Sequence, residues 1–180
     1  LHVCDQNLEQ IRPEQITSTD NLLVDVLLAA KYEGQSITRD YPKKYLATYN
    51  DSPSKMCTML ARSFADIGDI VRGKDLYLGN SREKEKLQTN LKSIFQNIYK
   101  NLKKPAQNHY SDPHGNFYKL REDWWNNNRK MVWRAITCGA GSGKYFRPTC
   151  GSGKTQTRDD CRCTSHDVPT YFDYVPQYLR

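Results

Sequence analysis

Residues 66–75 read DIGDIVRGKD, and they close the segment on which the predicted fold depends. Upstream of them, Pro53 suits the first turn of a helix, where its missing N–H is not needed. Between Pro53 and this stretch, apolar side chains recur every three or four residues, as they do on one face of a helix. This face, which includes one serine, consists of Met56, Met59, Leu60, Ser63, Phe64 and Ile67. Because Gly68 or Gly73 suits a helix end, the pattern predicts a helix over about residues 53–72.

Three further segments carry the same helical periodicity. They predict helices over about residues 20–48, 81–104 and 116–137. The first follows a capping cluster, Ser-Thr-Asp, at residues 18–20. Pro105 is expected to stop the second, because proline cannot continue the helical hydrogen bonding.

The remainder of the chain is a long loop followed by a short terminal segment. Residues 138–166 are rich in Gly, Ser and Cys and are expected to be irregular. After them, Asp167-Val168-Pro169 is typical of a helix cap, so residues 168–180 are predicted to start a further helix. No segment shows a sustained alternation of period two. The predicted fold class is therefore all-α, a cysteine-rich helical bundle with one long loop.

Composition limits the kinds of protein that this chain can be. Its 180 residues suit one domain or a large piece of one. No apolar run approaches the ~18–20 residues of a membrane helix, so we expect no membrane insertion by this segment. The net charge of +7 favours polyanionic partners, namely nucleic acid, anionic lipid or sulfated glycans. An even set of cysteines in such a chain favours disulfides and an oxidising compartment. The six are Cys4, Cys57, Cys138, Cys150, Cys161 and Cys163.

Residues 151–155, GSGKT, resemble the end of a phosphate-binding P-loop. The first glycine of that motif is missing, because Pro148 occupies its position. A P-loop also joins a strand to a helix, whereas here a helix precedes the loop and cysteines flank it. We therefore expect a surface loop, and a nucleotide-binding enzyme is kept only as an alternative.

The segment Cys161-x-Cys163-x-x-His166 has the residue types of a metal site. Its spacing is unlike the paired cysteines of zinc sites, which stand two to four residues apart with a second pair downstream. We expect Cys161 and Cys163 to point different ways and to form separate disulfides, with no metal and no cofactor. No combination of His, Ser and Cys forms a catalytic constellation, so we expect no enzyme activity.

The predicted helix over residues 81–104 is strongly basic. Its charges lie largely off the apolar stripe, which suggests a solvated face or one that binds polyanions by point charges. Cations of the next helix, among them Arg134, could extend this face, and no nucleic-acid-binding module is recognisable. The candidate ligand-binding residues are Arg82, Lys84, Lys86, Lys92, Lys100, Lys103, Lys104, Arg129 and Lys130.

The stretch at residues 66–75 resembles the signature of the alpha-class Duffy-binding-like domain. This class occurs in the variant erythrocyte membrane protein 1 family of the malaria parasite Plasmodium falciparum. Four further segments agree with it in order along nearly the whole chain. They are LLVDVLLAAKYEG at 22–34, REDWW at 121–125, VWRAITC at 132–138 and VPQYLR at 175–180.

The resemblance implies a non-enzymatic adhesin. Members of the family are exposed on the infected erythrocyte membrane, bind host erythrocyte or endothelial receptors, mediate cytoadherence or rosetting, and undergo antigenic variation. Receptors associated with the alpha class are heparan sulfate, blood-group sugars and complement receptor 1. The implied fold has three subdomains, and residues 1–180 correspond to the central one, with partners in the neighbouring subdomains. A structural spacer without a ligand of its own is the alternative.

The resemblance also implies a pairing of the cysteines. A bridge from Cys4 to Cys57 would tie the start of the bundle. In the family, the Cys-x-Cys pair tends to bridge to the third subdomain, so Cys161 and Cys163 would have partners outside this chain. Cys138 would then pair with Cys150.

Overall fold

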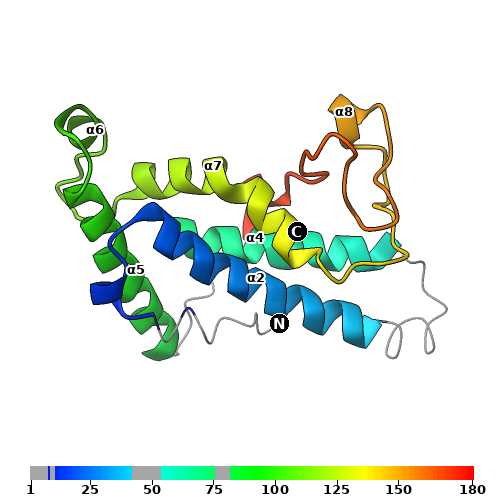
Figure 1. Ribbon diagram of the computed structural model, residues 1–180, viewed down its shortest axis with the longest axis horizontal. Coiled ribbons are helices and arrows are strands. Elements are labelled where there is room, and N and C mark those ends of the chain that lie inside the picture. The colour runs from blue at the N-terminus through cyan, green and yellow to red at the C-terminus, as the bar shows by residue number, and fades with distance from the viewer. Residues whose placement is uncertain (1–7, 9–10, 42–53, 76–81) are drawn as a thin grey trace.

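The computed structural model describes residues 8, 11–41, 54–75 and 82–180, and the long helices dominate it (Figure 1). These helices are α2 (Thr19–Tyr41), α4 (Ser54–Arg72), α5 (Arg82–Lys100) and α7 (Tyr118–Ile136). The shorter ones are α6 (Lys104–His109), α8 (Cys150–Gly153) and the single-turn segments η1 (Pro13–Gln15), η3 (Phe172–Tyr174) and η4 (Gln177–Leu179). The described residues contain two isolated bridges but no β-strand, which confirms the all-α prediction.

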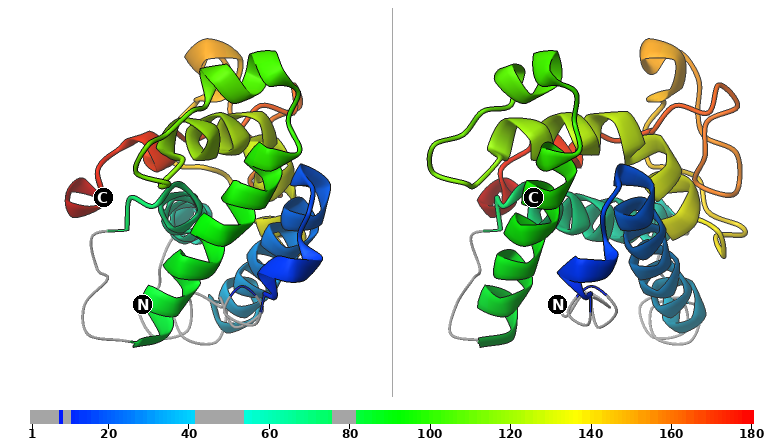
Figure 2. Two further views of the ribbon diagram at one scale, coloured as in Figure 1. Left: turned by 90° about the vertical axis from the view of Figure 1, so that its left-hand side faces the viewer. Right: turned by 60° about the vertical axis from the view of Figure 1, so that its left-hand side comes forward.

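Helices α2, α4 and α7 pack against one another and form the body of the domain. Figures 1 and 2 show α5 and α6 at one end of this body and the loop that carries α8 at the other. Helix α5 contacts both η1 and α7. The basic helix and the cysteine-rich loop are therefore two separate surfaces.

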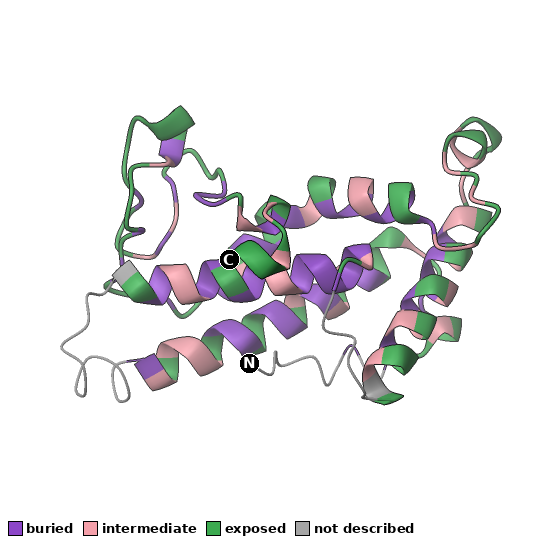
Figure 3. Cartoon of the chain, turned by 180° about the vertical axis from the view of Figure 1, so that it is seen from behind, coloured by how far each residue is buried: buried purple, intermediate pink, exposed green. Residues whose placement is uncertain are grey.

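The core lies where the three body helices face one another, and Figure 3 shows their buried residues on the inward sides. Phe64 of α4 packs between two tryptophans of α7. Its ring centroid lies 5.1 Å from that of Trp125 and 5.3 Å from that of Trp133, the latter edge-on. Edge-to-face and tilted pairs of this kind are favoured by the quadrupoles of the rings.

Two glycines allow the helices to approach closely. A Cβ at Gly34 would lie 1.8 Å from the carbonyl oxygen of Ile136, so α2 and α7 meet backbone to backbone. A Cβ at Gly68 would lie 2.7 Å from the ring of Trp125. Gly68 therefore lies within α4, where the absence of a side chain lets the helix pack closely against Trp125. The helix ends just before Gly73, whose φ is +73°.

Arg121 of α7 caps the C-terminal end of α4. Its Nε donates to the carbonyl of Val71 at 2.6 Å, and its Nη2 donates to the carbonyl of Ile70 at 3.1 Å and to Gln88 at 2.9 Å. These bonds satisfy carbonyls that a helix end leaves without partners. Because Arg121 is buried, its pKa is lowered to about 10.

Two helix predictions are confirmed and a third in its described part. Helices α4 and α7 match the predictions for residues 53–72 and 116–137 within two residues at each end. Helix α2 begins at Thr19, and Ser18 caps it by accepting a hydrogen bond from the N–H of Asn21. Residues 42–48 of that prediction lie outside the described residues.

Two helix predictions are wrong in part. The predicted helix over residues 81–104 ends at Lys100, and Pro105 lies in the first turn of a new helix, α6. Proline is well suited to a first turn, which explains this outcome. Residues 168–180 form only the single turns η3 and η4, because the buried Asp173 is turned inward and Pro176 interrupts the segment.

The disulfide pairing implied by the resemblance is also wrong. Cys57 pairs with Cys161 and Cys150 pairs with Cys163, whereas Cys138 is exposed and free. The predicted bridges Cys4–Cys57 and Cys138–Cys150 are therefore excluded, and Cys4 itself lies outside the described residues. The expectation that the two cysteines of the Cys-x-Cys pair join separate bridges is confirmed, with both partners inside the chain.

In the part of the chain that the structure describes, no helix has the length and apolar character needed to cross a membrane.

Candidate functional site

The cations of the predicted binding face lie on the solvent side of α5 and at the start of α6. The opposite side of α5 buries the apolar stripe of the helix, which fixes this orientation. Lys84 is the exception, because it is partly buried and its Nζ lies 3.9 Å from Asp75. We call the exposed remainder the cationic face: Arg82, Lys86, Lys92, Lys100, Lys103 and Lys104.

The cationic face is exposed along α5 and at the start of α6. Among the residues that the structure describes, none of its six members forms an ion pair. Lys86 and Lys100 lie on one side of α5 and are separated by about 21 Å along the helix axis, from the rise of 1.5 Å per residue. An extended array of free cations suits an extended anionic ligand better than a compact one.

The two predicted cations of α7, Arg129 and Lys130, do not extend this face. Arg129 is buried and its Nε lies 2.8 Å from Asp173, so its prediction as a surface ligand-binding residue is wrong. Lys130 is exposed, but it pairs with Asp167 at 3.0 Å and lies beside the loop that carries α8. The charge at the other end of the domain therefore belongs to a different surface.

A buried charge network joins α4, α7 and the C-terminal segment, and the sequence predictions missed it. In it, Arg72 contacts Asp69 and Glu122 at 3.0 Å each. A second arginine, Arg180, contacts Asp66 at 3.0 Å and also Asp69. The sequence does indicate such a network within residues 66–75, because the charged residues Asp66, Asp69 and Arg72 recur at helical spacing in a helix that is largely buried. The members of the network are Asp66, Asp69, Arg72, Glu122, Arg129, Asp173 and Arg180.

Burial changes the acidity of this network. It raises the pKa values of Asp66 and Asp69, although the hydrogen bonds from Arg180 act in the opposite direction. Burial also acts to raise the pKa of Glu122, but hydrogen bonds from Lys74 and Arg72 outweigh it and lower that pKa. Burial thus disfavours the charged forms of Asp66 and Asp69, whereas the hydrogen bonds to Glu122 favour its charged form.

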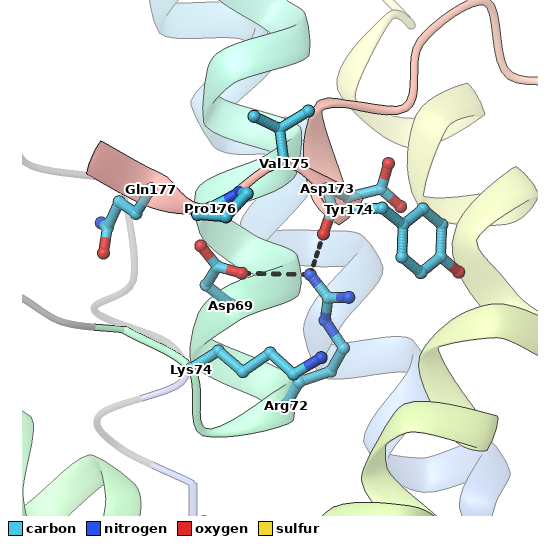
Figure 4. Close-up of a pocket in the computed structure, with 8 residues that line it drawn as sticks. All are labelled: Asp69, Arg72, Lys74, Asp173, Tyr174, Val175, Pro176 and Gln177. Atoms are coloured by element: carbon cyan, nitrogen blue, oxygen red, sulfur yellow. Dashed lines mark hydrogen bonds and ion pairs between the residues drawn. The ribbon is translucent and has the colours of Figure 1, made fainter. Parts of the chain in front are cut away.

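Figure 4 shows the small hollow above this network, with a volume of about 270 Å³. The guanidinium of Arg72 points at Asp69 and at the backbone carbonyl of Asp173, and Lys74 contacts Glu122. Since these side chains contact one another, the network joins α4, α7 and the C-terminal segment.

The P-loop-like residues adopt a different geometry from a nucleotide site. Gly151 and Ser152 have positive φ of 57° and 61° within the single turn α8, and no strand precedes them in the described part of the chain. The disulfide between Cys150 and Cys163 anchors this turn. The expectation of a surface loop is confirmed for these residues, which are exposed.

The family of the chain follows from its whole length. The family model of the Duffy binding domain matches residues 1–180. The chain belongs to the Duffy binding domain family. No curated protein matches this Duffy binding domain, whereas several solved structures do.

Several of these structures are domains of Plasmodium falciparum erythrocyte membrane protein 1 (PfEMP1), which confirms the resemblance. The NTS-DBL1α-1 domain from the varO strain is 43% identical, with a TM-score of 0.82, and the match covers 99% of this chain and 40% of that one. The NTS-DBL1α and CIDRγ double domain of the same strain is 44% identical, with a TM-score of 0.83 and coverages of 99% and 25%.

A more distant relative has a stated receptor. The ICAM-1-binding DBLβ domain of the PfEMP1 IT4var13 is 32% identical, with a TM-score of 0.72, and the match covers 99% of this chain and 39% of that one. This Duffy binding domain thus spans less than half the length of each of these relatives.

Proposed function

We propose that this domain is an extracellular adhesion module, displayed on the infected erythrocyte, that binds host-cell receptors and mediates cytoadherence or rosetting. The observation that carries the proposal is the cationic face, whose six exposed cations form no ion pair with any residue that the structure describes. In this proposal the chain is the central part of a larger Duffy-binding-like domain, and its exposed loop contributes to antigenic variation.

A sulfated glycan such as heparan sulfate is the receptor class that fits this face. Five of the six cations are lysines, which act as flexible point charges and suit a repeating anion rather than one shaped group. Contacts of this kind are weak singly and gain strength when many copies of the module bind one surface. Salt weakens them, because exposed charges are screened.

A protein receptor is the second candidate. It is supported by the relative at 32% identity, which is described as ICAM-1-binding. Protein interfaces depend on buried aromatic and apolar anchors more than on exposed lysines. Binding to a protein receptor should therefore depend less on salt than binding to heparin does. Blood-group sugars and complement receptor 1 are the other receptors that the alpha class suggests.

The cationic face is tested by retention on a heparin column. In the variant Lys100→Glu/Lys103→Glu/Lys104→Glu, the domain should elute at a much lower salt concentration. The matched control reverses three exposed lysines elsewhere, Lys31, Lys144 and Lys154, and so changes the net charge equally. The control should elute close to the wild type, because local rather than total charge decides binding.

Equal elution of the two variants would show that only net charge matters and would overturn the assignment to this face. If the wild type is not retained at all, the sulfated-glycan receptor is excluded and a spacer role gains support. A separate thermal melt with ATP addresses the nucleotide alternative, since a ligand of the native state must raise the melting temperature.

A further inference from the structure

The bridge between Cys57 and Cys161 divides the chain into an enclosed part and two outer parts. It joins the first turn of α4 to the end of the loop that carries α8, and Figure 1 shows that loop beside the start of α4. The enclosed part is residues 58–160, which contains the rest of α4 together with α5, α6, α7 and α8. The outer parts are residues 1–56, with α2, and residues 162–180, with η3 and η4. All members of the cationic face therefore lie in the enclosed part.

The bridge is held inside the domain. Both of its cysteines are fully buried and belong to the hydrophobic core. The indole N–H of Trp133 donates to the carbonyl oxygen of Cys161 at 3.2 Å, which fixes the end of the loop against α7. Reductants and thiolates attack a disulfide only where they can reach one of its sulfur atoms. We therefore expect the bridge to persist as long as the domain is folded.

The outer parts pack on the enclosed part through noncovalent contacts. Ser63 of α4 donates a hydrogen bond to the carboxylate of Glu33 of α2 at 2.8 Å. At the other end of the chain, Asp173 pairs with Arg129 of α7. Contacts of this kind separate when the ends of the chain are pulled and re-form when the pull stops. A disulfide, in contrast, stays closed unless it is reduced or exchanged.

Tension between the two ends of the chain follows the shortest covalent path. At Cys57 that path crosses the disulfide to Cys161, because the route along the backbone is longer by 104 residues. At ~3.6 Å per extended residue, this route is longer by about 370 Å, so it stays slack and carries no load. The second bridge, Cys150–Cys163, begins in the enclosed part and ends just after it. It does not change the path, because only residue 162 separates Cys161 from Cys163.

We infer that the Cys57–Cys161 bridge is a mechanical strap, which conducts tension between the chain ends past the segment that carries the cationic face. The outer parts can be drawn out under tension, whereas residues 58–160 cannot be extended while the strap is intact. A receptor bound at the face would load the enclosed part as well, and the strap then provides two covalent routes from α5 to the outer parts. The use of the strap rests on the proposed adhesion function, because a module that connects two cells is pulled when the cells separate.

Single-molecule stretching of the 180-residue chain between its ends tests the strap, with the contour length of the extended chain as the readout. All proteins carry Cys138→Ser, so that the exposed thiol cannot exchange with the bridges. At ~3.6 Å per residue, the oxidised parent should reach about 270 Å, because 104 of the 180 residues are bypassed. Cys57→Ala/Cys161→Ala should reach about 600 Å, because the other bridge excludes only 13 residues.

Cys150→Ala/Cys163→Ala is the matched control, because it also removes one bridge but leaves the strap. It should reach about 270 Å, like the oxidised parent. Dithiothreitol added to this control under tension reduces the strap to two thiols and should lengthen the chain in one step of about 370 Å. Contour length is read from the extended chain and so does not depend on the stability of a variant. Peptide mapping of each preparation establishes which bridge it contains.

The strap is overturned if the oxidised parent extends to about 600 Å or more, or if the two double variants extend equally. The strap and the cationic face can fail separately, because contour length tests only the first and heparin retention only the second. A domain that is retained on heparin but extends fully overturns the strap alone. A domain that stops at about 270 Å but is not retained overturns the sulfated-glycan receptor alone.

Discussion

Arg129 of α7 and Asp173 of η3 form a two-point ion pair, with Nε 2.8 Å from Oδ2 and Nη2 2.8 Å from Oδ1. The two residues are 44 positions apart, and the side chain of Asp173 is fully buried. Trp125 also donates to the same carboxylate at 2.9 Å. This pair fixes the C-terminal segment on the helical body, where the guanidinium of Arg129 lies 5.4 Å from the ring centroid of Tyr171.

Asp173→Asn should destabilise the domain strongly, because it leaves the buried charge of Arg129 without compensation. Breaking one side of a buried pair costs about 3–5 kcal/mol, to be measured by urea unfolding. Asp167→Asn is the control, since it breaks the exposed pair with Lys130 and should change stability little. Equal effects of the two substitutions would contradict a structural role for the buried pair.

The disulfides should be recovered as Cys57–Cys161 and Cys150–Cys163 by peptide mapping under non-reducing conditions. The first closes a separation of 104 residues, and losing a bridge over a loop of that size costs about 4–5 kcal/mol in the chain-entropy model. The second closes a separation of only 13 residues, so its loss should cost less, about 3 kcal/mol.

These costs are measured by replacing both cysteines of one bridge with alanine. A peptide that links Cys57 to any cysteine other than Cys161 would refute the pairing. A larger loss of stability from the shorter bridge would argue that strain or residual structure outweighs loop entropy.

Gly68→Ala should destabilise the domain by about 1–3 kcal/mol, the usual cost of overpacking a core. The new methyl group would lie 2.7 Å from the ring of Trp125, which is fully buried and cannot move freely. Gly141→Ala is the control, because a methyl group there would meet no described atom within 4 Å. Thermal melts of both variants decide the matter, and an unchanged melting temperature for Gly68→Ala would contradict the close approach.

Glu122→Gln should lower stability at neutral pH and have less effect in acid. The pKa of Glu122 is lowered in the folded state, so its stabilising contribution is present above its ordinary pKa of 4.5. That contribution is lost as the pH falls from 4.5 through the lower folded-state pKa. The difference in unfolding free energy between wild type and variant should therefore shrink over this range in urea titrations. A constant difference would mean that the carboxylate does not stabilise the fold through its charge.

Local patterns were enough to predict most of the helices. The apolar stripe before residues 66–75 predicts α4 correctly, because a helix face is set by side chains three and four residues apart. The basic side of α5 was predicted for the same reason, since charges that lie off an apolar stripe must face water. Local patterns also suggested a helix at residues 168–180, where the buried Asp173 and Pro176 produce separate turns instead.

Pairings between distant residues could not be read in the same way. Nothing near Cys57 indicates that it meets Cys161, because the bridge depends on how the long loop returns to α4. Arg129 likewise looked like one more surface cation, although its position on α7 directs it at Asp173. A one-dimensional pattern contains no information on which side chains meet after a loop.

The order of the residues along the chain was therefore enough to establish the helical class, the family and the basic side of α5, since each depends on neighbouring residues. The disulfides and the buried charge network became visible only in the folded chain. These features depend on contacts between segments up to 114 residues apart, as for Asp66 and Arg180, and such contacts form only when the apolar faces of the helices have packed.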